Sequence, residues 1–321
     1  MKVLVTGAAG MLGRKFCQEL AAKGAIAGRK VESLTMVDIV DSPPMESPFA
    51  TRSVAADLGA PGVAEQLVAN HPDIVLHTAA VVSGEAEADF DKGYRINVEG
   101  TRYLFEAIRK ANNRPRVVFT SSIAVFGAPF PETIGGEFFL TPLTSYGTQK
   151  AIGELLLADY TRKGFLDGIG IRLPTICVRP GKPNRAASSF FSGIIREPLN
   201  GQEAVLPVPD TVRHWLASPR AAVRFFFRAA EIDGALVGDR RNLSMPGLSA
   251  TVGEMIESLG RCAGPDPVKL IRREPDPTIM RIVEGWARNL DASRARGLGF
   301  EAETNFDEII RAHIEDAGIT V

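Results

Sequence analysis

The sequence has few cysteines, few histidines and almost no net charge. Its 321 residues include three cysteines and four histidines, and 37 Lys and Arg residues stand against 38 Asp and Glu residues. The cysteines are far apart and form no Cys-x-x-Cys pair, which argues against a metal knuckle and favours a reducing compartment. A chain with balanced charge lacks the long-range attraction of a non-specific nucleic-acid or anionic-membrane binder. We expect no metal, nucleic-acid or membrane partner.

Long apolar runs are also absent from the sequence. No stretch approaches the roughly 18 residues that a membrane helix needs. The chain opens on Met1-Lys2-Val3-Leu4-Val5, without the apolar segment of a secretory signal. A chain of this length buries enough surface to fold without disulfides or a structural metal. A cytoplasmic globular protein is therefore predicted.

Short β-branched runs alternate with longer helical patterns in the first half of the chain, which is typical of βαβ units and a parallel sheet. We expect strands at 2–6, 33–38, 73–77, 116–121 and 168–173, and helices at 11–23, 89–111 and 145–163. Prolines crowd the span from Pro174 to Pro209 and interrupt any long element there. The predicted fold is α/β, a Rossmann-type doubly wound parallel sheet over residues 1–174 with a smaller region over 175–321.

The glycine pattern directly after the first expected strand is the strongest local signal. Gly7, Gly10 and Gly13 form a G-x-x-G-x-x-G turn that opens the expected helix at Met11. Glycines permit the tight turn and let backbone N–H groups approach a pyrophosphate at the positive end of the helix. Because strand and helix are predicted independently of the glycines, the turn indicates dinucleotide binding rather than a plain connection.

Acidic residues follow the second and third apolar runs. Asp38 ends the second expected strand, where a carboxylate accepts hydrogen bonds from the adenosine ribose and repels a 2′-phosphate. The next residue, Ile39, offers no cation to such a phosphate. NAD is therefore predicted over NADP, and Asp57 is a weaker candidate for the adenine edge.

A serine, a tyrosine and a lysine complete a possible catalytic set. Tyr146 and Lys150 stand four residues apart near the start of an expected helix, so they share one face. A neighbouring ammonium and a positive nicotinamide both favour the phenolate, which makes Tyr146 a candidate general base. Ser122 directly follows the expected strand 116–121, at the carboxyl end, where open α/β sheets bind their ligands. Its hydroxyl would hold the substrate oxygen.

These motifs together resemble the extended short-chain dehydrogenase/reductases, over roughly residues 1 to 260. The resemblance is carried by Gly7, Gly10, Gly13, Asp57, His77-Thr78-Ala79-Ala80, Asn97 to Thr101, Ser122, Tyr146 and Lys150. It implies that Met11 and Leu12 lie at the pyrophosphate, Asp57 and Leu58 at adenine, Ala79 and Ala80 along the cofactor, and Asn97 and Pro174 near the nicotinamide half. Tyr146 and Lys150 would also contact NAD. The first region then holds NAD and the second the substrate, with about 212–248 returning to the cofactor domain. A homodimer through the helices at 89–111 and 145–163 is implied as well.

Departures from the superfamily patterns narrow the reaction. Dehydratases of this kind usually carry an Asp-Glu pair where this chain has Ile123-Ala124, which disfavours dehydration. The Arg-x-x-Asn pattern of epimerases is replaced within 172–181, and their later aromatic and acidic motif is replaced by 213–220. Both segments are similar to those of the bacterial dehydrogenase family that oxidises D-erythronate. That resemblance implies NAD-linked oxidation of a four-carbon sugar acid at its C2 hydroxyl to a 2-oxo acid.

A sugar-acid carboxylate calls for a guanidinium partner, and Arg179 and Arg213 are the candidates. The residues expected to contact the substrate are Ser83, Ser122, Tyr146, Thr175, Arg179 and Arg213. Two alternatives stay open: a nucleotide-sugar 4-epimerase with the same serine, tyrosine and lysine, and a non-catalytic NAD-binding sensor. His77, just after a buried strand, is expected to form structural hydrogen bonds rather than to act as a base.

Overall fold

A seven-stranded parallel sheet dominates the computed structural model, which describes residues 1–181 and 187–320. The spatial order is β12-β8-β7-β6-β1-β4-β5. In that order the strands are Asn242–Ser244, Asp167–Leu173, Arg116–Ser122, Ile74–His77, Lys2–Thr6, Ser33–Asp38 and Ala50–Ala55. The chain runs outward from β1 to β5 and then begins again at β6 on the other side of β1. The carboxyl ends of β1 and β6 therefore form a topological switch point, where ligands of such sheets bind.

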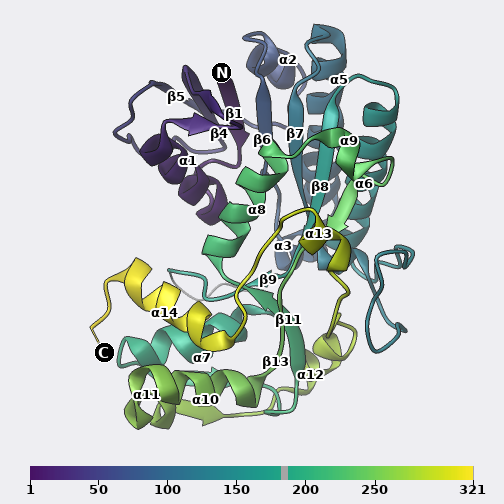
Figure 1. Ribbon diagram of the computed structural model, residues 1–321. Helices are drawn as coiled ribbons and strands as arrows, with labels where there is room; N and C mark the ends of the chain where they lie inside the picture. The colour runs from purple at the N-terminus through teal and green to yellow at the C-terminus, as the bar shows by residue number, and fades with distance from the viewer. Residues whose placement is uncertain (182–186, 321) are drawn as a thin grey trace.

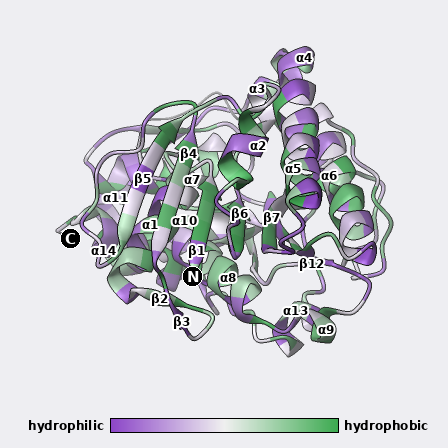
Figure 2. Ribbon diagram, turned by 90° about the horizontal axis from the view of Figure 1, so that it is seen from above, coloured by the Kyte–Doolittle hydropathy of each residue, from purple (hydrophilic) through white to green (hydrophobic). Residues whose placement is uncertain are grey.

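Helices cover both faces of this sheet and confirm the predicted doubly wound fold. The helices on one face are α1 (Met11–Lys23) and α8 (Pro219–Glu231), and those on the other are α2 (Val63–Val68), α5 (Thr101–Ala111) and α6 (Ser145–Arg162). Along β1, Val3 and Val5 enter the first core while Leu4 enters the second, because successive side chains of a strand point to opposite faces. The middle residues of the central strands β1, β6 and β7 are consequently apolar (Figure 2).

The segment expected as one helix over 89–111 is divided into three parts. It consists of α4 (Phe90–Gly93), a π-helical stretch η1 (Tyr94–Gly100) and α5. The wider π turn lies where Asn97 turns inward to meet neighbouring backbone and side-chain amides. Apolar periodicity does not separate a π turn from an α-helix, so the prediction of a single regular helix was wrong. π turns of this kind are frequent at functional sites.

The later part of the chain builds a second layer below the carboxyl ends of the large sheet (Figure 1). A three-stranded sheet, β13-β11-β9, lies at the junction and comprises Leu248–Thr251, Arg213–Ala217 and Thr175–Ile176. The helices α7 (Ser189–Leu199), α10 (Val252–Ala263) and α14 (Phe306–Ala317) pack together with β11 in their own core. A capping box begins α10, in which Thr251 and Glu254 cap the helix reciprocally.

Short elements complete the described part of the chain. They are β2 (Ala25–Ile26), β3 (Arg29–Lys30), α3 (Ser83–Ala88), η2 (Ile123–Val125), β10 (Ala204–Leu206), α9 (Gly234–Val237), α11 (Pro265–Lys269), β14 (Ile271–Arg273), α12 (Pro277–Glu284) and α13 (Ser293–Gly297). Among the helices within 1–181 and 187–320, none combines the length and apolar character needed to cross a bilayer.

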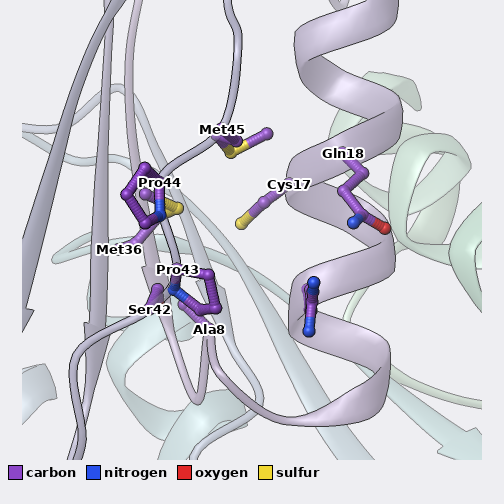
Figure 3. Close-up of a pocket in the computed structure, with 9 residues that line it drawn as sticks. Ala8, Cys17, Gln18, Met36, Ser42, Pro43, Pro44 and Met45 are labelled. Carbon is purple, nitrogen blue, oxygen red and sulfur yellow. The ribbon is translucent and has the colours of Figure 1, made fainter.

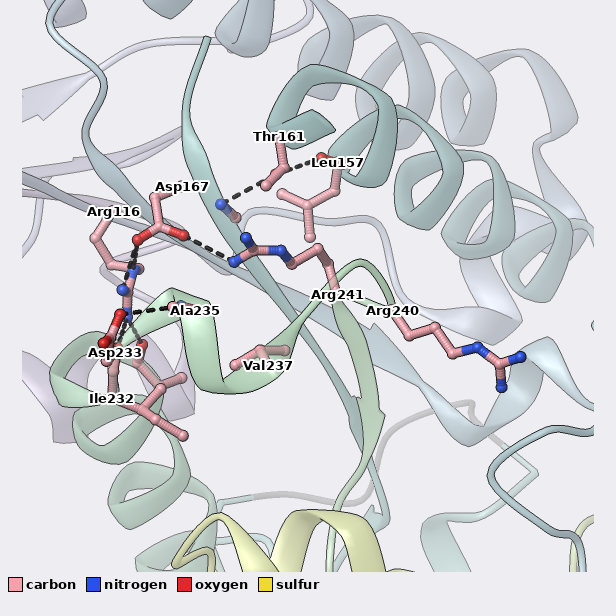
Figure 4. Close-up of polar contacts among 12 residues, drawn as sticks. Arg116, Leu157, Thr161, Asp167, Ile232, Asp233, Ala235, Val237, Arg240 and Arg241 are labelled. Atoms are coloured by element: carbon pink, nitrogen blue, oxygen red, sulfur yellow. Dashed lines mark hydrogen bonds and ion pairs between the residues drawn. The ribbon is translucent and has the colours of Figure 1, made fainter. Parts of the chain in front are cut away.

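An ion-pair cluster fastens the amino ends of β7 and β8 to the returning chain (Figure 4). The Asp167 carboxylate accepts hydrogen bonds from Arg116 at 2.6 Å and from Arg241, just before β12, at 2.9 Å. Arg116 also donates to the carbonyl oxygens of Ala229 and Ile232, at 2.7 Å each, where α8 ends. A cation at a helix C-terminus satisfies carbonyls that lack an intrahelical partner. The cluster therefore anchors α8 and β12 at the amino ends of β7 and β8, which lie at the end of the sheet opposite the switch point.

Candidate active site

The glycine turn between β1 and α1 allows no side chain at two of its positions. Gly7 has a φ of +75°, and a Cβ there would lie 2.6 Å from the backbone nitrogen of Ala79. A Cβ on Gly13 would lie 2.2 Å from the Gly7 carbonyl oxygen, so this glycine lets α1 pack closely on the turn. Gly10 is less crowded, with 3.2 Å to the same oxygen, and it is the N-cap of α1. These are the roles that a dinucleotide-binding turn gives its glycines.

The amino end of α1 is open to an anion. No side chain caps it, and the first turn, which includes Met11 and Leu12, contains no acidic residue. The N–H groups and the positive end of the helix dipole therefore have no internal counter-charge. This arrangement fits a pyrophosphate, because the first turn of the helix supplies backbone donors without an acidic side chain of its own.

Asp38 joins the end of β4 to the glycine turn. Its carboxylate accepts hydrogen bonds from the backbone N–H of Ala9 at 2.9 Å and from that of Ile39 at 2.7 Å. A carboxylate offers about four acceptor positions, so two are left for ribose hydroxyls. The residue thus lies where the sequence predicts a selector of the unphosphorylated ribose.

Asp57 follows β5 and is held by a neighbouring cation. Arg95, from η1, donates to it at 2.5 Å, and the Gly59 backbone N–H donates at 2.9 Å. Burial alone would raise the pKa of Asp57, but the hydrogen bonds from Arg95 and Gly59 outweigh it and lower that pKa. Leu58 beside it is buried in the core under α2 and α5. The Asp57 carboxylate is thus fixed between η1 and the loop after β5.

A small cavity between α1 and the segment after β4 is unsuitable for a nucleotide. It measures about 30 Å³ and is lined by Ala8, Cys17, Met36, Ser42 and Met45, among others (Figure 3). A space of this size accommodates a water molecule or two. Its lining includes none of Ser122, Tyr146 and Lys150, so it is not the reaction site.

The loop after β6 lies against the catalytic helix through buried amides. Asn97 accepts from the Val81 backbone N–H at 2.8 Å, donates to the Val81 carbonyl at 3.0 Å, and donates to Gln149 at 2.7 Å. The loop that carries Ala79 and Ala80 is thereby held at a fixed distance from α6. Asn97, expected near the nicotinamide half, has its side-chain amide engaged within the protein.

Ser122, Tyr146 and Lys150 converge at the carboxyl end of β7. Ser122 is the last residue of that strand, and its Oγ accepts the Ala124 N–H at 3.1 Å, which leaves its own proton free to be donated. Tyr146 stands in the first turn of α6, and the Ser122 hydroxyl acts to lower the pKa of its phenol. The Lys150 Nζ lies 5.7 Å from the centroid of the Tyr146 ring and donates to the Thr120 carbonyl at 2.8 Å.

Burial shifts both titrating groups of this set. It raises the pKa of Tyr146 to about 12, against the opposing effects of the Ser122 hydrogen bond and the positive charge of Arg179. It lowers the pKa of Lys150 to about 8, against the opposing charge of Glu154. At neutral pH the lysine is therefore charged and the tyrosine protonated, and further positive charge near the phenol would promote its ionisation.

The two candidate arginines have different surroundings. Arg179 follows β9, donates to the Ser188 hydroxyl at 2.8 Å, and is near enough for its charge to act on Tyr146. Arg213 donates to the Ser249 carbonyl at 2.7 Å and pairs with Glu254 at 3.3 Å, so it faces β13 and the start of α10. The charge of Arg179 acts on Tyr146, whereas the guanidinium of Arg213 is engaged by Ser249 and Glu254.

The remaining residues expected to contact the cofactor or the substrate lie next to β9 and at the start of α3. Pro174 is buried between β8 and β9, and Thr175 Oγ1 is 2.7 Å from Nε2 of the buried His214. Ser83 begins α3 and is partly exposed. His77 is buried with both ring nitrogens hydrogen-bonded, to Thr6 and Thr101, in agreement with the expected structural role.

Three buried polar residues of the site were missed from the sequence. Gln149 holds Asn97, and Glu154 on α6 binds Arg172 on β8 with distances of 2.7 to 3.2 Å. Glu154 stands four residues after Lys150 on an otherwise buried helix face, and that spacing was the available signal. Its partner Arg172 is recognisable only once the strand is packed against the helix.

Comparison with known proteins agrees with this geometry. The model of the NAD dependent epimerase/dehydratase family matches residues 3–231. The D-erythronate dehydrogenase of Cupriavidus necator is 47% identical over 323 residues, 99% of each chain, and that of Haemophilus influenzae is 41% identical over 315 residues, 98% of this chain and 99% of the other.

Solved structures are similar over the full chain. A crystal structure described as a nucleoside-diphosphate-sugar epimerase from Agrobacterium tumefaciens has 63% identity and a TM-score of 0.97, covering 100% of this chain and 95% of the other. The holo GalE-like L-threonine dehydrogenase of Cupriavidus necator, at 21% identity and a TM-score of 0.83 over 99% and 100% of the chains, shares the fold. The glycine turn, the serine, tyrosine and lysine, and these similarities lead to one conclusion: the chain belongs to the NAD dependent epimerase/dehydratase family, the extended short-chain dehydrogenase/reductases.

Proposed function

We propose that this protein oxidises the C2 hydroxyl of a four-carbon sugar acid, D-erythronate, to the 2-oxo acid with NAD as the electron acceptor. Two relatives that align over nearly the whole chain carry the name of this activity. The observation that carries the proposal is the convergence of Ser122, Tyr146 and Lys150 at the carboxyl end of β7, with the charge of Arg179 acting on Tyr146. A guanidinium beside the base suits a substrate whose carboxylate is next to the reacting carbon.

The reaction follows from the arrangement of the side chains. NAD, when bound, accepts the hydride that leaves C2. The Tyr146 phenolate takes the proton of the C2 hydroxyl, and the Ser122 Oγ–H donates to the same oxygen as it becomes a carbonyl. Lys150 stabilises the phenolate through its charge and supplies donors to the nicotinamide ribose. One proton moves to the tyrosine and two electrons leave with the hydride, so the balance is that of a simple alcohol oxidation.

Arg179 has two effects in this scheme. It binds the substrate carboxylate, and its charge favours the phenolate of Tyr146. Thr175 and Ser83 are proposed as partners of the remaining hydroxyls. Arg213 is the weaker candidate for the carboxylate because the Ser249 carbonyl and Glu254 engage its guanidinium.

The cofactor is proposed to be NAD rather than NADP. The uncapped start of α1 would hold the pyrophosphate, and Asp38, fixed by the Ala9 N–H, would bind the ribose hydroxyls and repel a phosphate. Asp57 with Leu58 would hold adenine, while Ala79 and Ala80 line the middle of the groove. In this scheme Asn97 positions the loop after β6, since its amide is hydrogen-bonded to Val81 and Gln149.

We also propose a cytoplasmic homodimer formed through 89–111 and α6. Leu155, on α6, is 66% exposed, which is high for a leucine on a helix that otherwise packs on the sheet.

A nucleotide-sugar 4-epimerase is the second candidate. The structure at 63% identity from Agrobacterium tumefaciens is described as a nucleoside-diphosphate-sugar epimerase. An epimerase of this kind uses the same serine, tyrosine and lysine. The two reactions differ in their yield of reduced cofactor. A dehydrogenase releases NADH at each turnover, whereas an epimerase returns the hydride to its substrate and shows no net NADH.

The test is NADH absorbance with a panel of four-carbon aldonic acids and UDP-sugars. We expect steady NADH formation with D-erythronate and none with UDP-sugars. Arg179→Met should raise KM for the acid about 10- to 100-fold, the cost of a charge-assisted contact, while Arg213→Met serves as the matched control with a nearly unchanged KM. Interconversion of UDP-sugars without net NADH would overturn the proposal in favour of the epimerase.

A further inference from the structure

Behind the catalytic lysine lies a buried cluster of charged and polar groups that the proposed chemistry does not use. The Glu154 carboxylate is 1% exposed and accepts hydrogen bonds from the Ser121 hydroxyl at 2.5 Å and from Arg172 at 2.7 and 2.9 Å. Arg172 is itself buried, and its guanidinium lies over the ring of Phe126, 5.0 Å from the centroid. A buried ion pair contributes little net stability because its desolvation costs about as much as its attraction returns. Its presence here therefore calls for a reason other than stability.

The cluster touches each element that carries a member of the catalytic set. Glu154 stands one helical turn after Lys150 on α6, and Ser121 immediately precedes Ser122 on β7. Lys150 donates to the carbonyl of Thr120, the residue before Ser121. Hydrogen bonds thus join α6 to two consecutive residues of β7, Thr120 and Ser121. The link from Glu154 to Arg172 extends the connection to β8. Any shift of α6 along β7 would break these contacts together.

The charges around Lys150 give Glu154 a second effect. Tyr146 and Glu154 flank the lysine on α6, His77 faces it from β6, and Arg172 stands behind Glu154 on β8. Burial lowers the pKa of His77 to about 3, so that ring is neutral at physiological pH. Burial likewise lowers the pKa of Lys150 to about 8, and the nearby negative charge of Glu154 opposes this. Without the carboxylate, the lowering of the Lys150 pKa by burial would lose the negative charge that opposes it.

We propose that Glu154, held by Ser121 and Arg172, is a positioning residue for the catalytic pair: it fixes the turn of α6 against the end of β7 and supplies the counter-charge of the Lys150 ammonium. This inference rests on the proposed dehydrogenase function for its kinetic consequence. Its structural and electrostatic content is independent of the substrate.

The first test is the titration of Lys150 in protein labelled with ¹³C at lysine Cε, with the resonance assigned by Lys150→Met. Glu154→Gln keeps the shape and the hydrogen-bonding capacity of the side chain but removes its charge. We expect the Lys150 titration midpoint to fall by about one pH unit, a tenfold change in its protonation equilibrium. The matched control is Asp167→Asn, which removes the carboxylate of the ion pair at the other end of β7 and β8. It should lower Tm but leave the Lys150 midpoint in place.

The kinetic test uses NADH formation across pH. In Glu154→Gln we expect kcat/KM at pH 7 to fall about twofold and its alkaline limb to move about one pH unit lower, because a Lys150 midpoint lowered from about 8 leaves only about half of the lysine charged at pH 7 to stabilise the phenolate. Arg172→Lys keeps every charge but loses the forked contact, so kcat should fall while the Lys150 midpoint stays. If Glu154→Gln does not fold, Arg172→Lys still tests the positioning role of the cluster.

The outcomes separate the two proposals. An unchanged Lys150 midpoint in Glu154→Gln, or an equal shift in Asp167→Asn, would overturn the role of Glu154. A shifted midpoint in a protein whose wild type forms no NADH from any aldonic acid would support that role and refute the dehydrogenase instead.

Discussion

Replacing His77 with glutamine should make the protein less sensitive to mild acid. His77 ends β6 and is 2% exposed, with its ring nitrogens 2.7 Å from the Thr6 hydroxyl and 2.9 Å from that of Thr101. Burial, helped by the positive charge of Lys150, lowers its pKa to about 3, whereas a histidine in an unfolded chain titrates near 6.5. The ring is therefore neutral in the folded protein over a range where the unfolded chain takes up a proton.

The size and direction of the effect follow from this difference. Below about pH 6.5 the unfolded state binds one more proton than the folded state, so the free energy of unfolding falls as pH falls, down to about pH 3. Above pH 6.5 the two states bind equally and the contribution is constant. At pH 5, about 1.5 units below 6.5, the loss is about 2 kcal/mol at roughly 1.4 kcal/mol per unit.

The assay is urea denaturation at pH 7.5 and pH 5.0. His77→Gln should lose about 2 kcal/mol less than the wild type between the two pH values, whatever its stability at pH 7.5. Thr101→Val is the control: it removes a hydrogen-bond partner of the ring but leaves the titrating group, so it should lower stability at both pH values by a similar amount. An equal acid-induced loss in wild type and His77→Gln would refute the reasoning.

Three further predictions concern the proposed site. Gly13→Ala should weaken NADH binding, measured by fluorescence titration, by about 100-fold, because the new Cβ would lie 2.2 Å from the Gly7 carbonyl oxygen; Gly10→Ala, with 3.2 Å of room, should be milder, and the reverse order would contradict the close-packing role. Tyr146→Phe should reduce kcat by about 1000-fold or more while the Kd for NADH changes less than about twofold; turnover near that of the wild type would exclude it as the base. Asp38→Ala should shift the ratio of kcat/KM for NAD over NADP by about tenfold or more towards NADP, and an unchanged ratio would show that the carboxylate does not select the cofactor.

The first half of the fold could be predicted closely because its strands are covered on both sides. The expected strands 2–6 and 33–38 coincide with β1 and β4. A strand buried between two helix layers is a nearly continuous apolar run, and such a run is easily recognised in a sequence. The junction sheet was missed: β9 has two residues and stands between prolines, and β11 depends for its identity on partners before and after it in the chain. Such strands exist through tertiary pairing and leave little periodic signal.

The same division applies to the candidate site. The turn that begins at Gly7, and the set of Ser122, Tyr146 and Lys150, could be located because chain order and spacing along single elements define them. The difference between Arg179 and Arg213 could not be seen, because the partner of the latter is a backbone carbonyl on a neighbouring strand. Contacts between elements distant in sequence are set by packing, and a sequence pattern does not report them.

The late arrival of β12 has a consequence for the nascent chain. This strand covers the outer edge of β8, pairing Asn242 with Gly170 and Leu243 with Ile171, yet it is synthesised only after β9 and β11 of the junction sheet. Until then β8, which is apolar along most of its length, presents an unpaired strand edge, the kind of surface that recruits other chains into aggregates. Fragments that stop after Leu173 would retain every residue of the glycine turn together with Ser122, Tyr146 and Lys150, but would keep this edge exposed. We therefore expect such fragments to aggregate, and useful truncations to extend beyond Ser244.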